Sequence, residues 1–216
     1  MSKKVLEEMY RNVYTILDDL IKEPVTELNY SSEFELLIAV MLSAQCTDKR
    51  VNIITDKLFK VYNTPYQYAN LTIEELEKYI SSCNFYHNKA KNIISMSKMI
   101  VSDYDGIVPS NHKDLVKLPG VGNKTANVML AVAFNIPAFP VDTHVFRVCN
   151  RLGLTKASNV LECEKKMTSI YPKEVWGKLH HLILLFGRYY CKAIKPACQD
   201  CVLSSYCKYR KNAKEK

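Results

Sequence analysis

A small number of side chains have types and spacings that could do chemistry. Lys124 follows a turn that contains two glycines, and Asp142 lies farther along the chain, after Pro140-Val141. An amine can act as a nucleophile, and a carboxylate can move a proton or stabilise a cation. Four of the eight cysteines lie near the C-terminus with the spacing C-x6-C-x2-C-x5-C, and they are Cys191, Cys198, Cys201 and Cys207.

The cysteine spacing by itself leaves two kinds of centre open. Zinc modules usually contain two C-x2-C pairs, and only one is present here. Zinc and an iron–sulfur cluster are therefore equally compatible with the spacing, whereas disulfides fit an intracellular chain less well. The other four cysteines are scattered through apolar or helical surroundings, where we expect small buried side chains. They are Cys46, Cys83, Cys149 and Cys163.

The turn before Lys124 reads Leu118-Pro119-Gly120-Val121-Gly122. Glycine permits positive φ and leaves neighbouring N–H groups uncovered by a Cβ atom. These donors would lie at the start of the next helix, where the helix dipole favours an anion such as a nucleic-acid phosphate. The alternative is a structural helical hairpin that binds no ligand.

Lys124 and Asp142 each allow an ordinary structural role. Lys124 could be a phosphate contact or a solvated charge. A cation in the first turn of a helix is disfavoured, and partial burial would favour the neutral, nucleophilic amine further. Asp142 could be a helix N-cap, a contact worth about 1 kcal/mol.

Composition narrows the class of protein. The 216 residues carry 30 Lys+Arg against 22 Asp+Glu, a net charge of +8, and 48% are hydrophobic. This balance is typical of a globular protein and suggests a polyanionic partner. The longest apolar runs, Leu36–Leu42 and Val128–Phe134, fall well short of the roughly 20 residues that a membrane span needs. With acids near the N-terminus instead of an apolar signal segment, we expect a cytoplasmic protein.

Hydrophobic periodicity and capping signals predict an all-α fold without strands. The basic tail Lys208–Lys216 is expected to be a frayed, solvated end. Pro24 and Pro137 interrupt the helical pattern, and so predict a central lobe of residues 24–136, with a helical hairpin at about 113–133. Residues 1–23 and 137–216 would form a second lobe containing a metal-binding loop at 191–207. Helices are expected near 5–20, 36–42, 48–61, 72–80, 88–101, 112–118, 124–134, 142–152, 160–170 and 175–190.

Four motifs in order resemble the endonuclease III family of helix-hairpin-helix DNA glycosylases. The turn from Leu118 to Asn127 is similar to the family's hairpin, and Val141–Val148 is similar to its acidic motif. Leu42–Asp48 matches a third signature, and the cysteine spacing matches the family's [4Fe–4S] loop. The resemblance covers about residues 5–209.

The resemblance implies a chemistry for these residues. It makes the protein a bifunctional DNA glycosylase and abasic-site lyase of base excision repair, acting on oxidised or ring-saturated pyrimidines. Lys124 would attack the sugar C1′, form a Schiff base and cause β-elimination at the 3′ phosphate, while Asp142 would be the catalytic carboxylate. The four C-terminal cysteines would hold a [4Fe–4S] cluster. The expected partner is double-stranded DNA with damaged bases or abasic sites, bound by a monomer.

Further DNA contacts also follow from the resemblance. Gln45 would fill the gap left by the flipped nucleotide, and Phe85 would be an apolar wedge where the family more often has leucine. Phe85 could instead be a core residue. Gly120, Val121 and Gly122 would contact phosphate through the backbone. Lys192 and Lys195 would add phosphate contacts at the cluster loop, with solvated charge as the alternative. Lys89, Lys91, Arg147 and Arg151 could extend the basic face.

Two other functions remain compatible with parts of the sequence. A monofunctional mismatch adenine glycosylase would share the fold, although Lys124 argues against it. A non-catalytic DNA-binding module with a structural metal would share the turn and the charge, but would leave the pairing of Lys124 with Asp142 unexplained.

Overall fold

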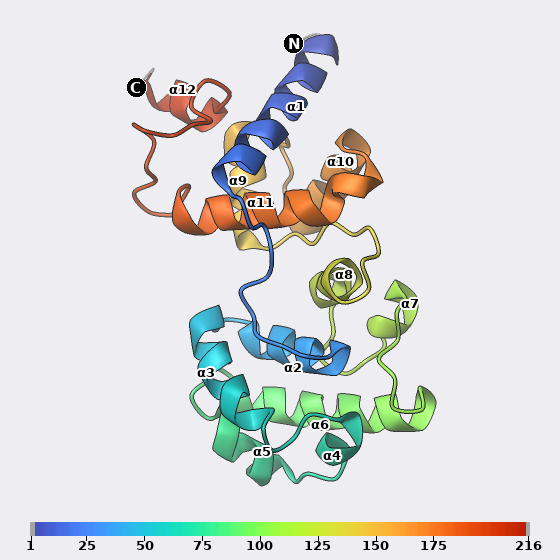
Figure 1. Ribbon diagram of the computed structural model, residues 1–216. Coiled ribbons are helices and arrows are strands. Elements are labelled where there is room, and N and C mark those ends of the chain that lie inside the picture. The colour runs from blue at the N-terminus through green and yellow to red at the C-terminus, as the bar shows by residue number, and fades with distance from the viewer. Residues whose placement is uncertain (1–2, 215–216) are drawn as a thin grey trace. The chain divides into compact units, whose positions relative to one another are not determined.

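The computed structural model describes residues 3–214, and every regular element in this range is a helix (Figure 1). No strand occurs among these residues, which confirms the all-α prediction. No helix in this range is long and apolar enough to cross a membrane. The helices are α1 (Lys3–Leu20), α2 (Glu33–Ser43), α3 (Asp48–Leu58), α4 (Pro65–Ala69), α5 (Ile73–Ile80), α6 (Tyr86–Asp103), α7 (His112–Leu115), α8 (Asn123–Val132), α9 (Thr143–Leu152), α10 (Val160–Ile170), η1 (Lys173–Val175, a 3-10 turn), α11 (Trp176–Tyr189) and α12 (Lys208–Lys214).

The chain divides into two compact units. The central unit is Glu27–Ile136, and the terminal unit combines Met1–Thr26 with Pro137–Lys216. The boundaries expected from the sequence are Pro24 and Pro137. Each unit has its own hydrophobic core, and each is described separately below.

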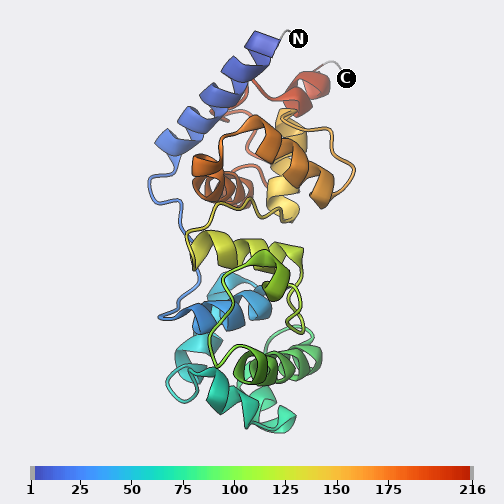
Figure 2. The same cartoon turned by 90° about the vertical axis from the view of Figure 1, so that its right-hand side faces the viewer.

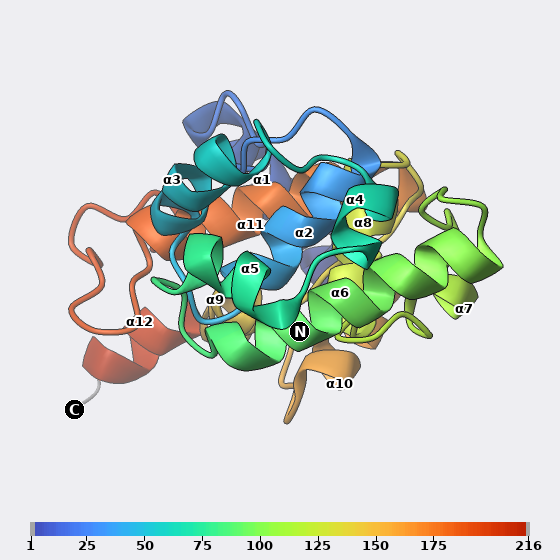
Figure 3. The ribbon, with the colours of Figure 1, turned by 90° about the horizontal axis from the view of Figure 1, so that it is seen from below.

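The central unit is built around α2. Residues Phe34 to Leu42 of this helix are all buried, and α3, α6 and α8 pack against it. Ser32 Oγ caps the helix by accepting from Glu35 N at 3.2 Å. The Glu35 carboxylate accepts from Ser31 N at 2.6 Å, one residue before the partner expected in a capping box. Figure 3 shows α6 passing beside α4 and α5.

One helix of the central unit was not anticipated. The short helix α4 begins with Thr64 as N-cap, Pro65 at the first helical position and Gln67 completing a capping box. These are the ordinary start signals of a helix, but the helix has only five residues, too few to show an apolar period. The helix expected from Asn88 also starts earlier, at Tyr86.

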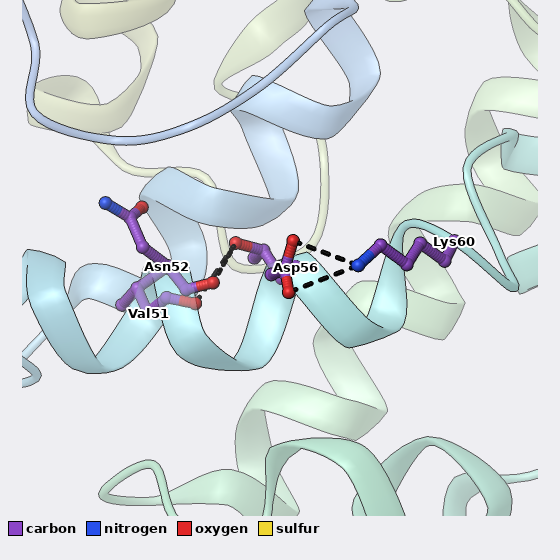
Figure 4. A network of polar contacts seen from close by, with 5 residues as sticks. Val51, Asn52, Asp56 and Lys60 are labelled. Atoms are coloured by element: carbon purple, nitrogen blue, oxygen red, sulfur yellow. Dashed lines mark hydrogen bonds and ion pairs between the residues drawn. The ribbon is translucent and has the colours of Figure 1, made fainter.

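Figure 4 shows polar contacts along α3 and just after its end. Lys60 Nζ lies 3.3 Å from the Asp56 carboxylate, and both side chains are exposed. The Thr55 hydroxyl donates to the carbonyls of Val51 and Asn52 on the same helix. Exposed ion pairs such as Asp56–Lys60 contribute little to stability. We assign no catalytic role to these contacts.

The terminal unit packs α1 against α11, and α11 against α9. Figure 2 shows α1 in blue beside the orange and red C-terminal helices of this unit. The Tyr171 hydroxyl donates to Tyr10 O at 3.0 Å, and Lys178 Nζ lies 2.7 Å from the Asp18 carboxylate. A Cβ at Gly187 would lie 3.0 Å from His144 Cβ, so this glycine permits the close approach of α9 and α11.

The prediction of a frayed basic tail is wrong for residues 208–214, which form α12. The Lys211 amide donates to the carbonyl of Cys207. The guanidinium of Arg151 lies 4.6 Å from the centre of the Tyr209 ring. Such a cation–π contact fixes the start of this helix against α9. Residues 215 and 216 lie outside the described range.

Candidate functional site

The helical hairpin lies in the central unit, between α7 and α8. The helix expected at 112–118 is shorter, ending at Leu115, and Leu118 and Val121 are buried as anchors of the turn. Gly120 has φ +79°, and a Cβ there would come within 2.8 Å of Met41 Cε and 2.9 Å of Asn92 Cβ. Gly120 is therefore required both by its backbone conformation and by its contact with α2 and α6.

Gly122 has a different role from Gly120. Its φ is −92°, an ordinary value for any residue, and a Cβ would meet no atom within 4 Å. Gly122 is the N-cap of α8, and no side chain caps the helix there. Open space in front of a helix N-terminus is the geometry that accepts a phosphate group.

The two glycines predict opposite effects of the same substitution. We expect Gly120→Ala to lower stability through strain and collision, because the left-handed conformation and Met41 both oppose a side chain. Gly122→Ala should leave the melting temperature nearly unchanged and weaken binding to abasic DNA, because the new methyl group occupies the open space. Thermal unfolding and fluorescence anisotropy measure the two effects. Unchanged DNA affinity in Gly122→Ala would contradict a phosphate at this turn.

Lys124 is the second residue of α8 and its side chain is exposed. The partial burial that the sequence allowed for is absent. An exposed amine in the first turn after the hairpin is accessible to a substrate bound at the turn. His112 and Asn123 join the two helices beside it through a 2.8 Å hydrogen bond from Nε2 to Oδ1.

Asp142 is the N-cap of α9 in the terminal unit. Its Oδ1 accepts from Val145 N at 2.8 Å, and the residue is half-buried. The cap role weighed from the sequence is therefore present. A cap also fixes the direction of the carboxylate, which is a useful property in a catalytic group. Lys124 and Asp142 lie in different units.

Gln45 and Phe85 lie on neighbouring loops of the central unit. Both have left-handed backbones, with φ of 54° and 58°. Phe85 is 61% exposed, so the alternative of a core phenylalanine is wrong. Asn84 Nδ2 donates to Gln45 O at 2.8 Å and joins the two loops. An exposed phenylalanine held beside an exposed glutamine can enter the space that a flipped nucleotide leaves.

The C-terminal cysteines lie together in the terminal unit. Burial raises the pKa of the Cys201 and Cys207 thiols, and charge on Cys191 and Cys198 raises it further. Among the described residues, no group of three or more metal-binding side chains is spaced for one metal ion. A single zinc ion needs sulfurs about 2.3 Å from one centre, whereas a four-iron cluster spreads its thiolates over four irons. Four free cysteines on one loop can supply one thiolate to each iron of such a cluster.

Two arginines of α9 hold the start of this loop. Arg147 donates to Cys191 O at 3.1 Å and to Gly187 O at 2.8 Å. Arg151 donates to Lys192 O at 2.7 Å and to Ala193 O at 2.9 Å, and its Nη1 lies 3.5 Å from Cys191 Sγ. These arginines therefore orient the first ligand and do not form a basic face. No local pattern in the sequence indicates these contacts, because they join residues about forty positions apart.

Lys192 and Lys195 are exposed at the same loop. Lys195 has φ +49°, so the chain turns sharply between the first two cysteines. Neither lysine is buried among apolar side chains. Their ammonium groups are accessible to a DNA backbone, as the phosphate role requires, and equally accessible to water.

Loss of Arg151 should weaken the cluster loop. We expect Arg151→Ala to lose the cluster faster under chelator or oxygen, because the carbonyls of Lys192 and Ala193 and the Cys191 sulfur lose their donor. Decay of visible absorbance together with iron and sulfide content measures the effect. Lys165→Ala on α10 is the control, because Lys165 is exposed in the same unit. Equal decay in the two variants would contradict the bracing role.

Comparison with known proteins supports the resemblance to the endonuclease III family over most of the chain. The profile of the HhH-GPD superfamily of base excision DNA repair proteins matches residues 38–173. The iron–sulfur binding domain of endonuclease III matches residues 191–207. Endonuclease III of Bacillus subtilis (strain 168) is 50% identical over 193 residues, covering 89% of this chain and 88% of the relative.

Two solved structures are similar in fold and sequence. One is a non-covalent endonuclease III–DNA complex, with a TM-score of 0.93 and 45% identity, covering 97% of this chain and 99% of that chain. The other is a trapped endonuclease III–DNA covalent intermediate, also with a TM-score of 0.93 and 45% identity, covering 96% and 98%. The similarity therefore includes both the hairpin and the cysteine loop.

Proposed function

The chain belongs to the endonuclease III family of the HhH-GPD superfamily, DNA glycosylases and abasic-site lyases of base excision repair with a [4Fe–4S] cluster, and from this premise we propose which of its residues carry the reaction and on which DNA. The observation that carries the proposal is the exposed Lys124 amine, placed in the first turn of α8 directly after the hairpin.

Lys124 is the proposed nucleophile. Its neutral amine attacks the sugar C1′, and the glycosidic bond breaks, so that the damaged base leaves with the bonding electrons. Opening of the sugar ring gives an iminium ion between Nζ and C1′. Loss of a proton from C2′ then expels the 3′ phosphate, and hydrolysis of the imine releases the enzyme.

Asp142 is the proposed carboxylate partner. Its charge stabilises the cationic sugar as the base departs, and it accepts the proton that the Lys124 ammonium must lose before attack. The N-cap hydrogen bond from Val145 N holds the carboxylate in one orientation throughout. A rigid carboxylate stabilises developing charge without first having to reorganise.

Other residues of the chain place the DNA. The backbone of Gly120, Val121 and Gly122 binds a phosphate at the hairpin, and Lys192 and Lys195 bind the DNA backbone at the cysteine loop. Gln45 and Phe85 occupy the gap left by the extruded nucleotide. The cluster, when bound, cross-links Cys191, Cys198, Cys201 and Cys207 and so orders a loop with few apolar residues.

The proposed substrates are oxidised or ring-saturated pyrimidines in double-stranded DNA, together with abasic sites, and the proposed active form is a monomer. Incubation with a panel of lesion duplexes in EDTA tests this. We expect strand scission at thymine glycol and dihydrouracil and none at undamaged DNA. Adenine release opposite 8-oxoguanine without scission would instead indicate the monofunctional mismatch glycosylase. An elution volume of a dimer in size-exclusion chromatography would contradict the monomer.

A further inference from the structure

Two loops of the central unit carry strained residues side by side. The Gln45 loop comprises residues 43–47, and the Phe85 loop comprises residues 81–85. Each has its proposed DNA-inserting residue in the left-handed region, with φ of 54° at Gln45 and 58° at Phe85. Left-handed backbone is unfavourable for side chains of this size and persists only where the surrounding structure holds it. The contacts that hold these two residues are therefore of functional interest.

Lys89 makes the shortest of these contacts. It lies in the first turns of α6, directly after the Phe85 loop, and only 8% of the residue is exposed. Its Nζ donates to Leu42 O and to Ala44 O, each at 2.7 Å. These carbonyls belong to the last turn and C-cap of α2, where a helix has no internal donors and attracts a cation. The ammonium thus ends α2 one residue before Gln45.

The same two loops touch at two further points. Asn84 Nδ2 donates to Gln45 O at 2.8 Å. Cys83 Sγ lies 3.6 Å from Cys46 Sγ, a contact without a covalent bond. Burial raises the pKa of the Cys83 thiol to about 11, so this thiol is protonated at neutral pH. Together with Lys89, which lies just after the Phe85 loop, these contacts hold the two segments together on both sides of Gln45.

A buried ammonium is unfavourable unless it is fully hydrogen-bonded, and burial lowers the pKa of Lys89. An apolar side chain of similar length would fill the same space without that penalty. Its presence is explained if the two carbonyls before Gln45 must be fixed, because Lys89 donates to both at 2.7 Å, whereas the Cys83 thiol reaches only Leu42 O, at 3.9 Å.

We propose that Lys89 is a positioning residue that holds Gln45 in its left-handed conformation, so that Gln45 and Phe85 meet the DNA as one preformed unit. The inference rests on the proposed function, because it takes Gln45 to be a DNA-inserting residue. Lys89 itself touches neither the reacting sugar nor the base. Preorganisation of this kind lowers the ordering cost of binding.

A double-mutant cycle tests whether Lys89 affects activity by positioning Gln45. We expect Lys89→Met and Gln45→Ala each to lower kcat/KM on an abasic duplex by roughly tenfold to hundredfold, since small misplacements have effects of this size. The double variant should lose no more than Gln45→Ala alone. Lys89→Arg should recover part of the loss, and Lys98→Met, an exposed lysine on the same helix, is the matched control. Losses that multiply in the double variant would overturn the inference.

The Cys46–Cys83 contact supplies a readout that needs no DNA. Diamide removes two electrons and two protons from this thiol pair, forming a disulfide and the corresponding hydrazine. Peptide mass spectrometry gives the rate, while visible absorbance checks that the cluster persists. We expect the disulfide to form several-fold more slowly in Lys89→Met, because the loops separate. An unchanged rate would overturn the inference.

The kcat/KM values and the disulfide rate distinguish failure of the proposed Gln45 role from failure of the proposed Lys89 role. A full kcat/KM in Gln45→Ala would contradict the proposed role of Gln45, whereas the disulfide rate still decides whether Lys89 holds the loops. If Lys89→Met does not fold, Asn84→Leu replaces it. Asn84 is exposed, and this variant removes only the 2.8 Å link to Gln45 O. It should show the same slowed disulfide formation, and a rate equal to that of the unmodified protein would contradict the proposal that side-chain contacts hold the two loops together.

Discussion

Lys124→Gln is expected to abolish both strand scission and borohydride trapping on abasic duplex DNA. Glutamine is similar in length to lysine, but its amide nitrogen has no nucleophilic lone pair, so no Schiff base can form. Without an imine there is no species for borohydride to reduce and no iminium to activate the C2′ proton. Denaturing gel electrophoresis after borohydride treatment measures both losses in one experiment.

The control for this variant is Lys117→Gln on the same hairpin. Lys117 is exposed and forms an ion pair with Asp114 at 2.7 Å, so its replacement removes a nearby positive charge and leaves the Lys124 amine in place. Trapping should persist in this control. Equal loss in both variants would mean that charge at the hairpin, and not an amine at position 124, is what the reaction needs.

Asp142→Asn is expected to lower the rate of base release by about 10²–10⁴-fold, the usual contribution of a positioned acid or base, with little change in stability. Asparagine caps a helix about as well as aspartate, so the bond from Val145 N survives and only the charge is lost. Asp142→Ala removes both the charge and the cap. Its free energy of unfolding should fall by about 1 kcal/mol relative to Asp142→Asn.

Single-turnover base release and urea unfolding, measured on the same preparations, separate the two roles of Asp142. Full activity in Asp142→Asn would leave the residue as an N-cap only. A large fall in stability in Asp142→Asn would mean that the carboxylate charge supports the fold, and the loss of rate would then not identify a catalytic group.

Local signals in the sequence predict the helices and much of the site. Thr72 and Glu75 form the capping box that their spacing indicates, and Asn159 and Asp142 cap the helices that follow them. Hairpin, lysine and cysteine spacing are likewise contiguous patterns. Each of these patterns consists of residues that are close together in the chain, so a single sequence is sufficient to recognise it.

Contacts between distant residues explain what the sequence did not predict. Arg151 is attached to residues 192 and 193, and Lys89 to residues 42 and 44. Both were candidates for a DNA-facing surface, because a basic side chain gives no local sign that it is turned inward. The different roles of Gly120 and Gly122 also depend on packing, since only one of them faces Met41.

The amine of Lys124 is the group that we propose forms the covalent bond to the sugar. The most direct measurement is borohydride trapping of the unmodified protein on an abasic duplex, followed by proteolysis and mass spectrometry of the cross-linked peptide. We expect one modified peptide, with the reduced sugar on Lys124 Nζ. Modification of another lysine or of the N-terminal amine, with Lys124 unmodified, would contradict it.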